Sequence, residues 1–234
     1  MSKIFRKIRQ QMLIKGSVRK YLIYAIGEIT LVVFGILIAL SLSNWKESIE
    51  RNKLEKSLYG DLIDELQIDL SEIQGNRAYN QKYLLRYREG SSIILTDSEH
   101  ELVDTLAHIA LDLTKFSDFK NEGSAYEKLA VSGKIDLVSS NDILNSLQNL
   151  GILYTYINRI EQNQVDFMYT IVPKITDFLR INPLTVMRPD KLYGYNFHND
   201  LELIISIGVE KEGLYQQAEE DLSSLIKALE KQIE

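Results

Sequence analysis

The sequence contains no cysteine and only three prolines. Without cysteine, disulfide bonds, cysteine-based zinc sites and thiol catalysis are excluded. Glycine is also modest, at 12 of 234 residues, so few positions interrupt helix formation. We therefore expect a largely helical protein that is held together without disulfide bonds.

The short motifs of common catalytic and cofactor sites are also missing. The sequence has no G-x-S-x-G nucleophile elbow, no P-loop, no G-x-G-x-x-G and no H-E-x-x-H. His100 and His108 are eight residues apart on one expected helix, too far to share a metal ion, and His198 is remote in sequence. We therefore expect no enzymatic activity, no metal site and no cofactor.

Acidic residues outnumber basic residues outside the N-terminus. Residues 1–45 hold seven of the 27 Lys and Arg residues and one of the 33 acids, so residues 46–234 hold 20 basic and 32 acidic residues. A nucleic-acid-binding protein carries positive charge on its folded domain, so we expect no nucleic-acid partner. Contact with anionic lipid is expected instead for the basic residues Lys3, Arg6, Lys7, Arg9, Arg19 and Lys20.

One long apolar run, YLIYAIGEITLVVFGILIALSL, occupies residues 21–42. As a helix this run is roughly 33 Å long, enough to cross a hydrocarbon core of ~30 Å. Tyr21 and Tyr24 at one end and Trp45 at the other stand where amphipathic rings anchor a span to the two interfaces. The basic residues before the run predict a cytoplasmic N-terminus.

These features predict a single-pass membrane protein in three parts. Residues 1–20 are the basic cytoplasmic juxtamembrane segment, residues 21–43 the transmembrane helix, and residues 44–234 the extracytoplasmic domain. A cleaved signal peptide is disfavoured because the apolar run is too long and lacks an A-x-A site. Its length and flanks also disfavour a buried core helix. Residues 1–20 themselves fit either a helix on the inner leaflet or a solvated tail that only sets topology.

Glu28 is unusual because it lies inside the apolar run, about 10 Å along the helix. A carboxylate at this depth is costly, so it should be protonated, paired or turned toward a polar interior. The sequence places no basic residue within one turn of it.

Glu28, Val32, Gly35, Ala39 and Ser43 share one helix face, and the last three form a small-xxx-small run. This face predicts association with a second copy or with another membrane protein. The alternative is that small residues are simply common in membrane helices. An acid in a single span before an extracytoplasmic domain also matches the layout of stator-like subunits of proton-coupled complexes.

The rest of the sequence predicts helices. Apolar residues recur every three or four positions from Leu54 to Ile73, which predicts a long helix over residues 45–89, weakened or broken at Gly75 and Asn76. The acids in this helix are expected to form a solvated face. Further helices are expected at residues 99–113, 125–132, 141–180, 200–207 and 214–233.

Local signals refine these boundaries. Capping boxes are expected at Ser98 with Glu101 and at Ser124 with Glu127, and a kink is expected at Pro173. Residues 135–138 are expected to be extended and residues 182–197 to form a loop. The expected fold is all-α, with one N-terminal transmembrane helix followed by an extracytoplasmic bundle of four or five helices.

Two stretches carry a resemblance to a known family. FRKIRQ, followed by KYLIYAIGEITLVVFGILIAL and Asn44-Trp45, resembles the opening of an uncharacterised Bacteroidota family of single-pass membrane proteins, a domain of unknown function. AYEKLAVSGKIDLVSSNDIL, at residues 125–144, resembles that family's middle segment. The resemblance implies an inner-membrane protein that faces the periplasm, and it brings no activity, cofactor or catalytic residue. It also implies that Gly27 and Glu28 are a family trait.

Taken together, the sequence predicts a non-enzymatic, membrane-anchored protein acting in protein interaction, assembly or scaffolding. Its expected partners are the lipid bilayer and a second copy or another membrane protein, bound through the transmembrane helix. The alternative is a periplasmic sensor or ligand-binding module, which is disfavoured because about 20 cytoplasmic residues are too few for an output domain. The stator-like role of Glu28 is a further alternative.

Overall fold

The computed structural model describes residues 18–120 and 124–234. The chain divides into a first unit, Met1–Leu54, and a second unit, Glu55–Glu234. Helix α2, Val18–Thr96, is 79 residues long and runs through both. The break expected at Gly75 and Asn76 is wrong, because both residues lie within this helix. Gly75 has open space beside it, and Asn76 uses its side chain to bond the Asp118 carbonyl.

In the first unit, α2 is the one helix among the described residues that is long and apolar enough to cross a membrane. Thirteen large hydrophobic side chains between residues 22 and 42 are 47–74% exposed. No described part of the chain covers this apolar stretch, which agrees with the expectation of a single apolar helix near the N-terminus.

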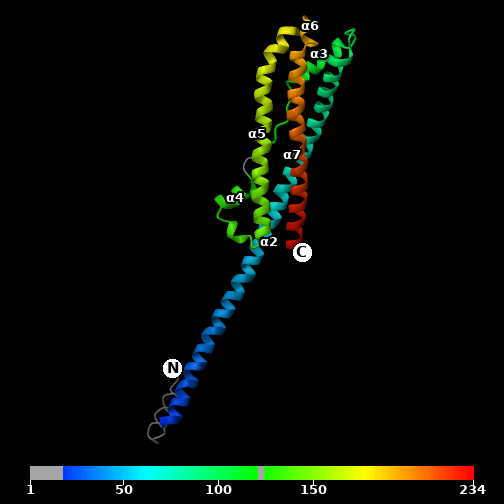
Figure 1. Cartoon of the computed structure of the whole chain (residues 1–234). Coiled ribbons are helices and arrows are strands. Elements are labelled where there is room, and N and C mark those ends of the chain that lie inside the picture. The colour runs from blue at the N-terminus through cyan, green and yellow to red at the C-terminus, as the bar shows by residue number, and fades with distance from the viewer. Residues whose placement is uncertain (1–17, 121–123) are drawn as a thin grey trace. The chain divides into compact units, whose positions relative to one another are not determined.

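In the second unit, three long helices form the body. They are the later part of α2, α5 (Asn141–Phe178) and α7 (Tyr195–Ile233). Figure 1 shows α5 and α7 side by side, with α3 (Val103–Asp112) and α6 (Pro189–Leu192) toward one end and α4 (Ala125–Val131) toward the other. The all-α expectation is confirmed at this level.

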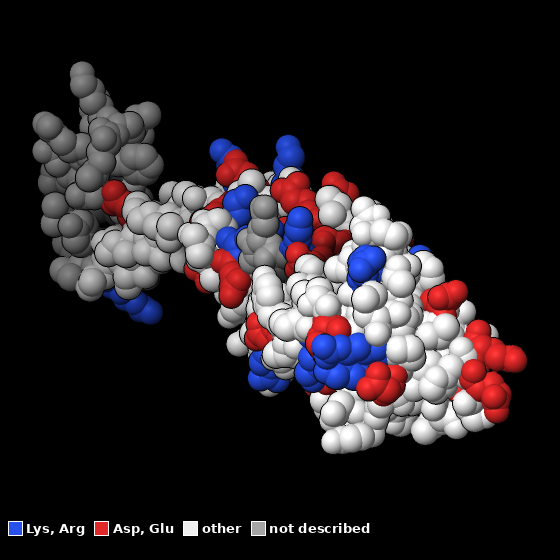
Figure 2. Space-filling model, turned by 90° about the horizontal axis from the view of Figure 1, so that it is seen from above, with Lys and Arg blue, Asp and Glu red and all other residues white. Residues whose placement is uncertain are grey.

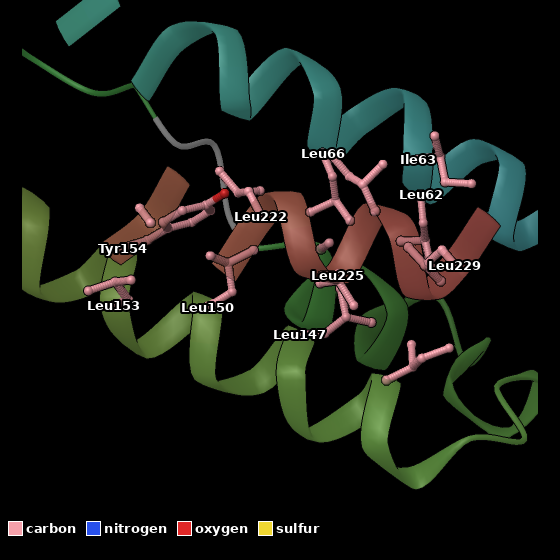
Figure 3. Close-up of a cluster of buried hydrophobic side chains, with 14 of the residues drawn as sticks. Leu62, Ile63, Leu66, Leu147, Leu150, Leu153, Tyr154, Leu222, Leu225 and Leu229 are labelled. Carbon is pink, nitrogen blue, oxygen red and sulfur yellow. The ribbon is translucent and has the colours of Figure 1, made fainter. Parts of the chain in front are cut away.

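Two apolar clusters fill the second unit. The first joins residues 58–73 of α2, 143–157 of α5 and 215–229 of α7 with α4. Figure 3 shows the side chains of this cluster meeting from the three helices, among them Leu66, Leu150 and Leu222. The second cluster joins Tyr87 and Ile93 of α2, the buried face of α3, the end of α5 and the start of α7.

Helix starts follow local side-chain chemistry. Ser124 and Glu127 form the expected capping box of α4, and Gly133, with φ +67°, follows its end. Ser140 caps α5 by accepting the backbone N–H of Ile143. The capping box expected at Ser98 and Glu101 is wrong. Asp97 instead accepts the backbone N–H groups of Glu101 and Leu102, and α3 begins only at Val103.

Three further local expectations are wrong. Residues 135–138 contain the 3₁₀ helix η1, Ile135–Leu137, and not an extended segment. The two expected C-terminal helices are one helix, α7, because Gly208 packs against Leu84 and Asn80, and Gly213 sits in open space. The expected loop at residues 182–197 contains a strand and a helix: β2 (Leu184–Val186) pairs antiparallel with β1 (Leu179–Ile181), and α6 follows.

Gly90 marks a close contact within the second apolar cluster. A Cβ built there would lie 2.8 Å from Cγ2 of Ile109, a fully buried side chain. Since Cγ2 is attached directly to a β-branched Cβ, it has little freedom to move away. Gly60, on the same helix, has nothing within 4 Å of such an atom.

We therefore expect opposite effects from alanine at these two glycines. Gly60→Ala should raise the free energy of unfolding by about 0.5–1 kcal/mol through helix propensity alone. Gly90→Ala should lower it by about 1–3 kcal/mol through overpacking. Thermal and denaturant unfolding followed by circular dichroism would measure both. Equal stabilisation by the two substitutions would contradict the packing at Gly90.

Candidate functional site

The face predicted for membrane-helix association lies wholly on α2. Val32, Gly35, Ala39 and Ser43 are exposed, while Glu28 is half-buried and already takes part in an interaction. Because α2 is an unbroken helix here, the spacing of these residues does place them on one face. Association through this face stays a prediction.

The predicted interfacial and lipid-facing residues are only partly described. Trp45 is 66% exposed on α2, Tyr24 is half-buried, and Arg19 is exposed. Tyr21 and Lys20 belong to α2, but their side chains are outside the described set. Lys3, Arg6, Lys7 and Arg9 lie outside the described residues, so their contact with lipid stays a prediction.

A layer of buried polar side chains separates the two apolar clusters of the second unit. On each long helix it falls between the residues of the first cluster and those of the second, except that Tyr215 also belongs to the first cluster. We call it the polar layer, and it consists of Asn80, Ser117, Glu161, Gln164, Lys211 and Tyr215. Asn80 donates to the carbonyl of Gly208 at 2.9 Å, which ties α2 to α7.

Lys211 is the most buried charged residue of the layer, with 1% of its surface exposed. Its ammonium donates to Oγ of Ser117 and to Oε1 of Gln164, each at 2.6 Å, and more weakly to the Ser117 carbonyl at 3.4 Å. These acceptors are neutral, so they compensate only part of the cost of removing the charge from water. Burial accordingly lowers the pKa of Lys211 to about 8, although Glu161 and Asp118 oppose the shift.

Glu161 is the second buried charge, with 4% of its surface exposed. Both carboxylate oxygens accept the backbone N–H of Phe119, at 3.1 Å each, and Oε1 also accepts a short hydrogen bond from the Tyr215 hydroxyl. Burial raises the pKa of Glu161 even though these hydrogen bonds favour its ionised form. Burial likewise raises the pKa of Tyr215, reinforced by the Glu161 carboxylate.

The polar layer holds an irregular segment in place. Residues 113–120, between α3 and α4, carry backbone groups that no helix or strand satisfies. Glu161 accepts the N–H of Phe119, Gln164 donates to the carbonyl of Lys115, and Lys211 donates to that of Ser117. From α2, Glu72 accepts the N–H of Lys120. Side chains of all three long helices therefore replace the missing backbone partners.

This segment and α5 form the walls of an open pocket of about 450 Å³. Glu161 and Phe119 are its buried residues, and Phe116, Asp118, Lys120 and Gln162 are exposed around them. A carboxyl group with a raised pKa next to a pocket is a candidate for binding or chemistry, because its charge state responds to what enters.

A second polar cluster superficially resembles a serine hydrolase site. Oγ of Ser91 lies 3.0 Å from Nε2 of His198 and donates to Oε1 of Glu202 at 2.5 Å. Since Ser91 gives its only proton to Glu202, the His198 nitrogen is the donor and not the acceptor. A base that activates a serine must accept that proton, with the acid on the other ring nitrogen. The cluster therefore links α2 to α7 without activating Ser91.

The histidines considered as metal ligands in the sequence either pack against a ring or lie at the surface. His100 has φ +57° and stacks on Tyr193 at 3.8 Å, and His108 is exposed. Across residues 18–120 and 124–234, no group of three His, Asp or Glu side chains could hold a metal ion.

The acids of α2 are only partly a solvated face. Asp61 and Asp64 are exposed, but Asp69 accepts the Tyr154 hydroxyl at 2.8 Å and Glu65 pairs with Lys128 at 2.6 Å. Burial raises the pKa of Asp69.

Sequence reasoning missed the polar layer, although a signal was present. Lys211 continues the buried series Leu201, Ile204 and Gly208 on α7 at steps of three or four residues. Glu161 and Gln164 likewise follow Ile157 on the buried face of α5. A charged residue in register with an apolar stripe indicates a buried ion, but it does not reveal which acceptors it meets.

The comparison with protein families gives a match. The model of a family of unknown function, DUF6090, matches residues 28–184. No curated protein and no solved structure matches the chain. The matched residues include Glu28 and Glu161, and they end before α6 and α7. The expected resemblance to an uncharacterised family is thus confirmed in its general form, and the bacterial group stays a prediction.

The shifted pKa of Lys211 predicts how stability depends on pH. The pKa falls from 10.5 to about 8 on folding, so the unfolded chain holds this proton more tightly. Stability should therefore rise with pH between these values. We expect Lys211→Met to remove that rise, a difference on the order of 1–2 kcal/mol between about pH 7.5 and 9.5.

Denaturant unfolding of the wild type and the variant across this pH range would measure the difference, in which other titrating groups cancel. Lys227→Met, at an exposed position of the same helix, is the matched control and should keep the wild-type slope. An unchanged slope in Lys211→Met would mean that Lys211 titrates normally in the folded protein.

Proposed function

The chain belongs to the DUF6090 family, whose function is unknown, and we propose that it is a single-pass inner-membrane protein whose periplasmic helical domain acts in protein interaction, assembly or scaffolding and not as an enzyme. Its N-terminus is cytoplasmic. The observation that carries the proposal is the bare apolar surface of α2 between residues 22 and 42.

The energetics favour lipid as the environment of this surface. Thirteen exposed large hydrophobics, each worth about 0.3–0.6 kcal/mol of insertion free energy, outweigh a cost of about 3 kcal/mol for one acid in the span. Soluble monomers rarely expose a continuous apolar patch above a few hundred Å².

The domain supports an interaction role through its surface. Residues 46–234 are acidic in balance, and Figure 2 shows acidic and basic side chains interspersed on the visible face. Exposed hydrophobics such as Ile68, Leu85, Tyr169 and Tyr195 are 66–75% exposed on the second unit. Aromatic and aliphatic side chains of this kind are common at the centres of protein interfaces.

A periplasmic sensor or ligand-binding module is the second candidate. The polar layer favours it, because Glu161 connects an open pocket with Tyr215 and through Ser117 with Lys211. A ligand in the pocket would then change hydrogen bonds that involve both α5 and α7.

Topology is tested with reporters at the C-terminus. We expect an alkaline phosphatase fusion to be active and a green fluorescent protein fusion to be dark, because the first folds only outside the cytoplasm and the second only inside. Replacing Lys3, Arg6, Lys7, Arg9, Arg19 and Lys20 by alanine is expected to weaken this orientation. A fluorescent, phosphatase-inactive fusion of the unaltered chain would reverse the proposed topology.

Association through the span is tested with single cysteines, since the chain has none of its own. Under mild oxidation in membranes, Ala39→Cys should form a disulfide-linked dimer at least about five-fold more than Leu37→Cys, which lies on the opposite face. Adding Glu28→Leu should change the yield of the Ala39→Cys dimer if the carboxyl belongs to the contact. Equal cross-linking at positions 37 and 39 would remove this face as the contact.

A further inference from the structure

We propose that the pocket between residues 113–120 and α5 binds a small organic cation, an amine that carries an apolar group. This inference rests on the second candidate function, a ligand-binding module, and names the chemistry of its ligand. The pocket, of about 450 Å³, falls within the 300–1,000 Å³ typical of small-molecule sites.

The buried carboxylate of Glu161 supplies the anchor. An ionised carboxylate offers about four lone-pair positions, and the Phe119 N–H is shared between the two oxygens while the Tyr215 hydroxyl takes Oε1. Oε2 therefore retains capacity to accept another hydrogen bond. Because 96% of the residue is shielded from water, a charge that reaches it interacts more strongly than one at the surface.

The rim of the pocket is rich in acceptors. Asp118 brings a second, exposed carboxylate, and Gln162 has its amide nitrogen engaged with Asp166 at 2.9 Å, which leaves its carbonyl oxygen available. An ammonium has three donors and no acceptor, so it complements such a lining. Lys120 contributes the opposing positive charge in the lining.

An aromatic ring completes the match. Phe116 lines the pocket and is 39% exposed, and the aliphatic side chain of Val165 belongs to the same lining. A cation over a phenyl ring gains about 0.5–1 kcal/mol at an exposed site, and an apolar group on the ligand gains burial. An anion would meet two acids of the described lining, Asp118 and Glu161, against one lining cation, Lys120.

The electrostatics of Glu161 agree with this geometry. Burial, with a smaller contribution from Asp118, raises its pKa. A bound cation favours the ionised carboxylate, so binding is linked to proton release when Glu161 is partly protonated. The cation that acts on this carboxyl is Lys211 on α7, the Tyr215 hydroxyl is bonded to it, and Lys120 lines the same pocket.

The test titrates the full-length protein in detergent micelles with phenethylammonium chloride by calorimetry. The neutral probe phenethyl alcohol and the anionic probe phenylacetate serve as matched comparisons. We expect the amine to bind at least about ten-fold more tightly than either. Titration in buffers of different ionisation enthalpy should show proton release on binding near the pKa of Glu161.

Substitutions inside and outside the pocket test where the amine binds. Asp118→Asn, at an exposed side chain, and Glu161→Gln should each weaken amine binding at least about five-fold, whereas Lys120→Ala should tighten it. Glu210→Gln, an exposed acid of α7 outside the pocket, is the control and should bind like the wild type. If Glu161→Gln fails to fold, Asp118→Asn and Lys120→Ala carry the test.

The possible outcomes distinguish the cation site from the ligand-binding function on which it rests. Tighter binding of the alcohol or phenylacetate, lost in the Asp118 or Lys120 variants, would keep a ligand-binding module but overturn the cation. Amine binding that none of the variants alters would overturn the pocket. Absence of binding by all three probes would overturn both.

Discussion

The hydrogen bonds around the buried ammonium of Lys211 set how α5, α7 and residues 113–120 fit together. A charge that has left water needs acceptors, and these come from Gln164 on α5 and Ser117 on the irregular segment. Moving α7 by one residue along α5 would separate Lys211 from both. Glu161 and Tyr215 repeat the constraint one turn away. Leucine stripes alone would tolerate several registers, so the polar layer selects one.

The same layer explains why an irregular segment can lie within a helical bundle. Residues 113–120 contain backbone groups with no helix or strand partner, and side chains of the long helices supply the partners. The arrangement couples the segment to the two apolar clusters on either side, with Leu113 in one and Phe119 in the other. It also brings a buried carboxylate to a pocket that is open to solvent. Structure and candidate chemistry therefore depend on the same few residues.

The first unit follows a different principle. From residue 22 to residue 42 the helix is stabilised by its own backbone hydrogen bonds, and thirteen of its large hydrophobic side chains are exposed. Such a segment is compatible with lipid because a helix satisfies every backbone group internally. Glu28 is the exception in the run, and its energetic cost is small enough for the remaining apolar residues to offset.

Local sequence signals were partly reliable. The Ser124–Glu127 box and the end of its helix before Gly133 were predicted correctly, because each depends on neighbouring residues. The Ser98–Glu101 box was wrong, because Asp97 accepts the backbone N–H groups instead. Signals that tertiary packing overrides were unreliable. Gly75 and Gly208 have sequences that suggest breaks, yet the helices continue, since packing along α2 and α7 outweighs a propensity cost of about 1 kcal/mol.

By itself, the sequence determined the apolar helix near the N-terminus, the all-α class and the absence of disulfides, because these depend on composition and on periodicity along one segment. Only the tertiary structure decided which charges are buried and what they meet. Lys211 lies 94 residues from Ser117 and 47 from Gln164 in the sequence. Periodicity along one helix can show that a lysine faces the core, but it cannot show which distant side chains accept its hydrogen bonds.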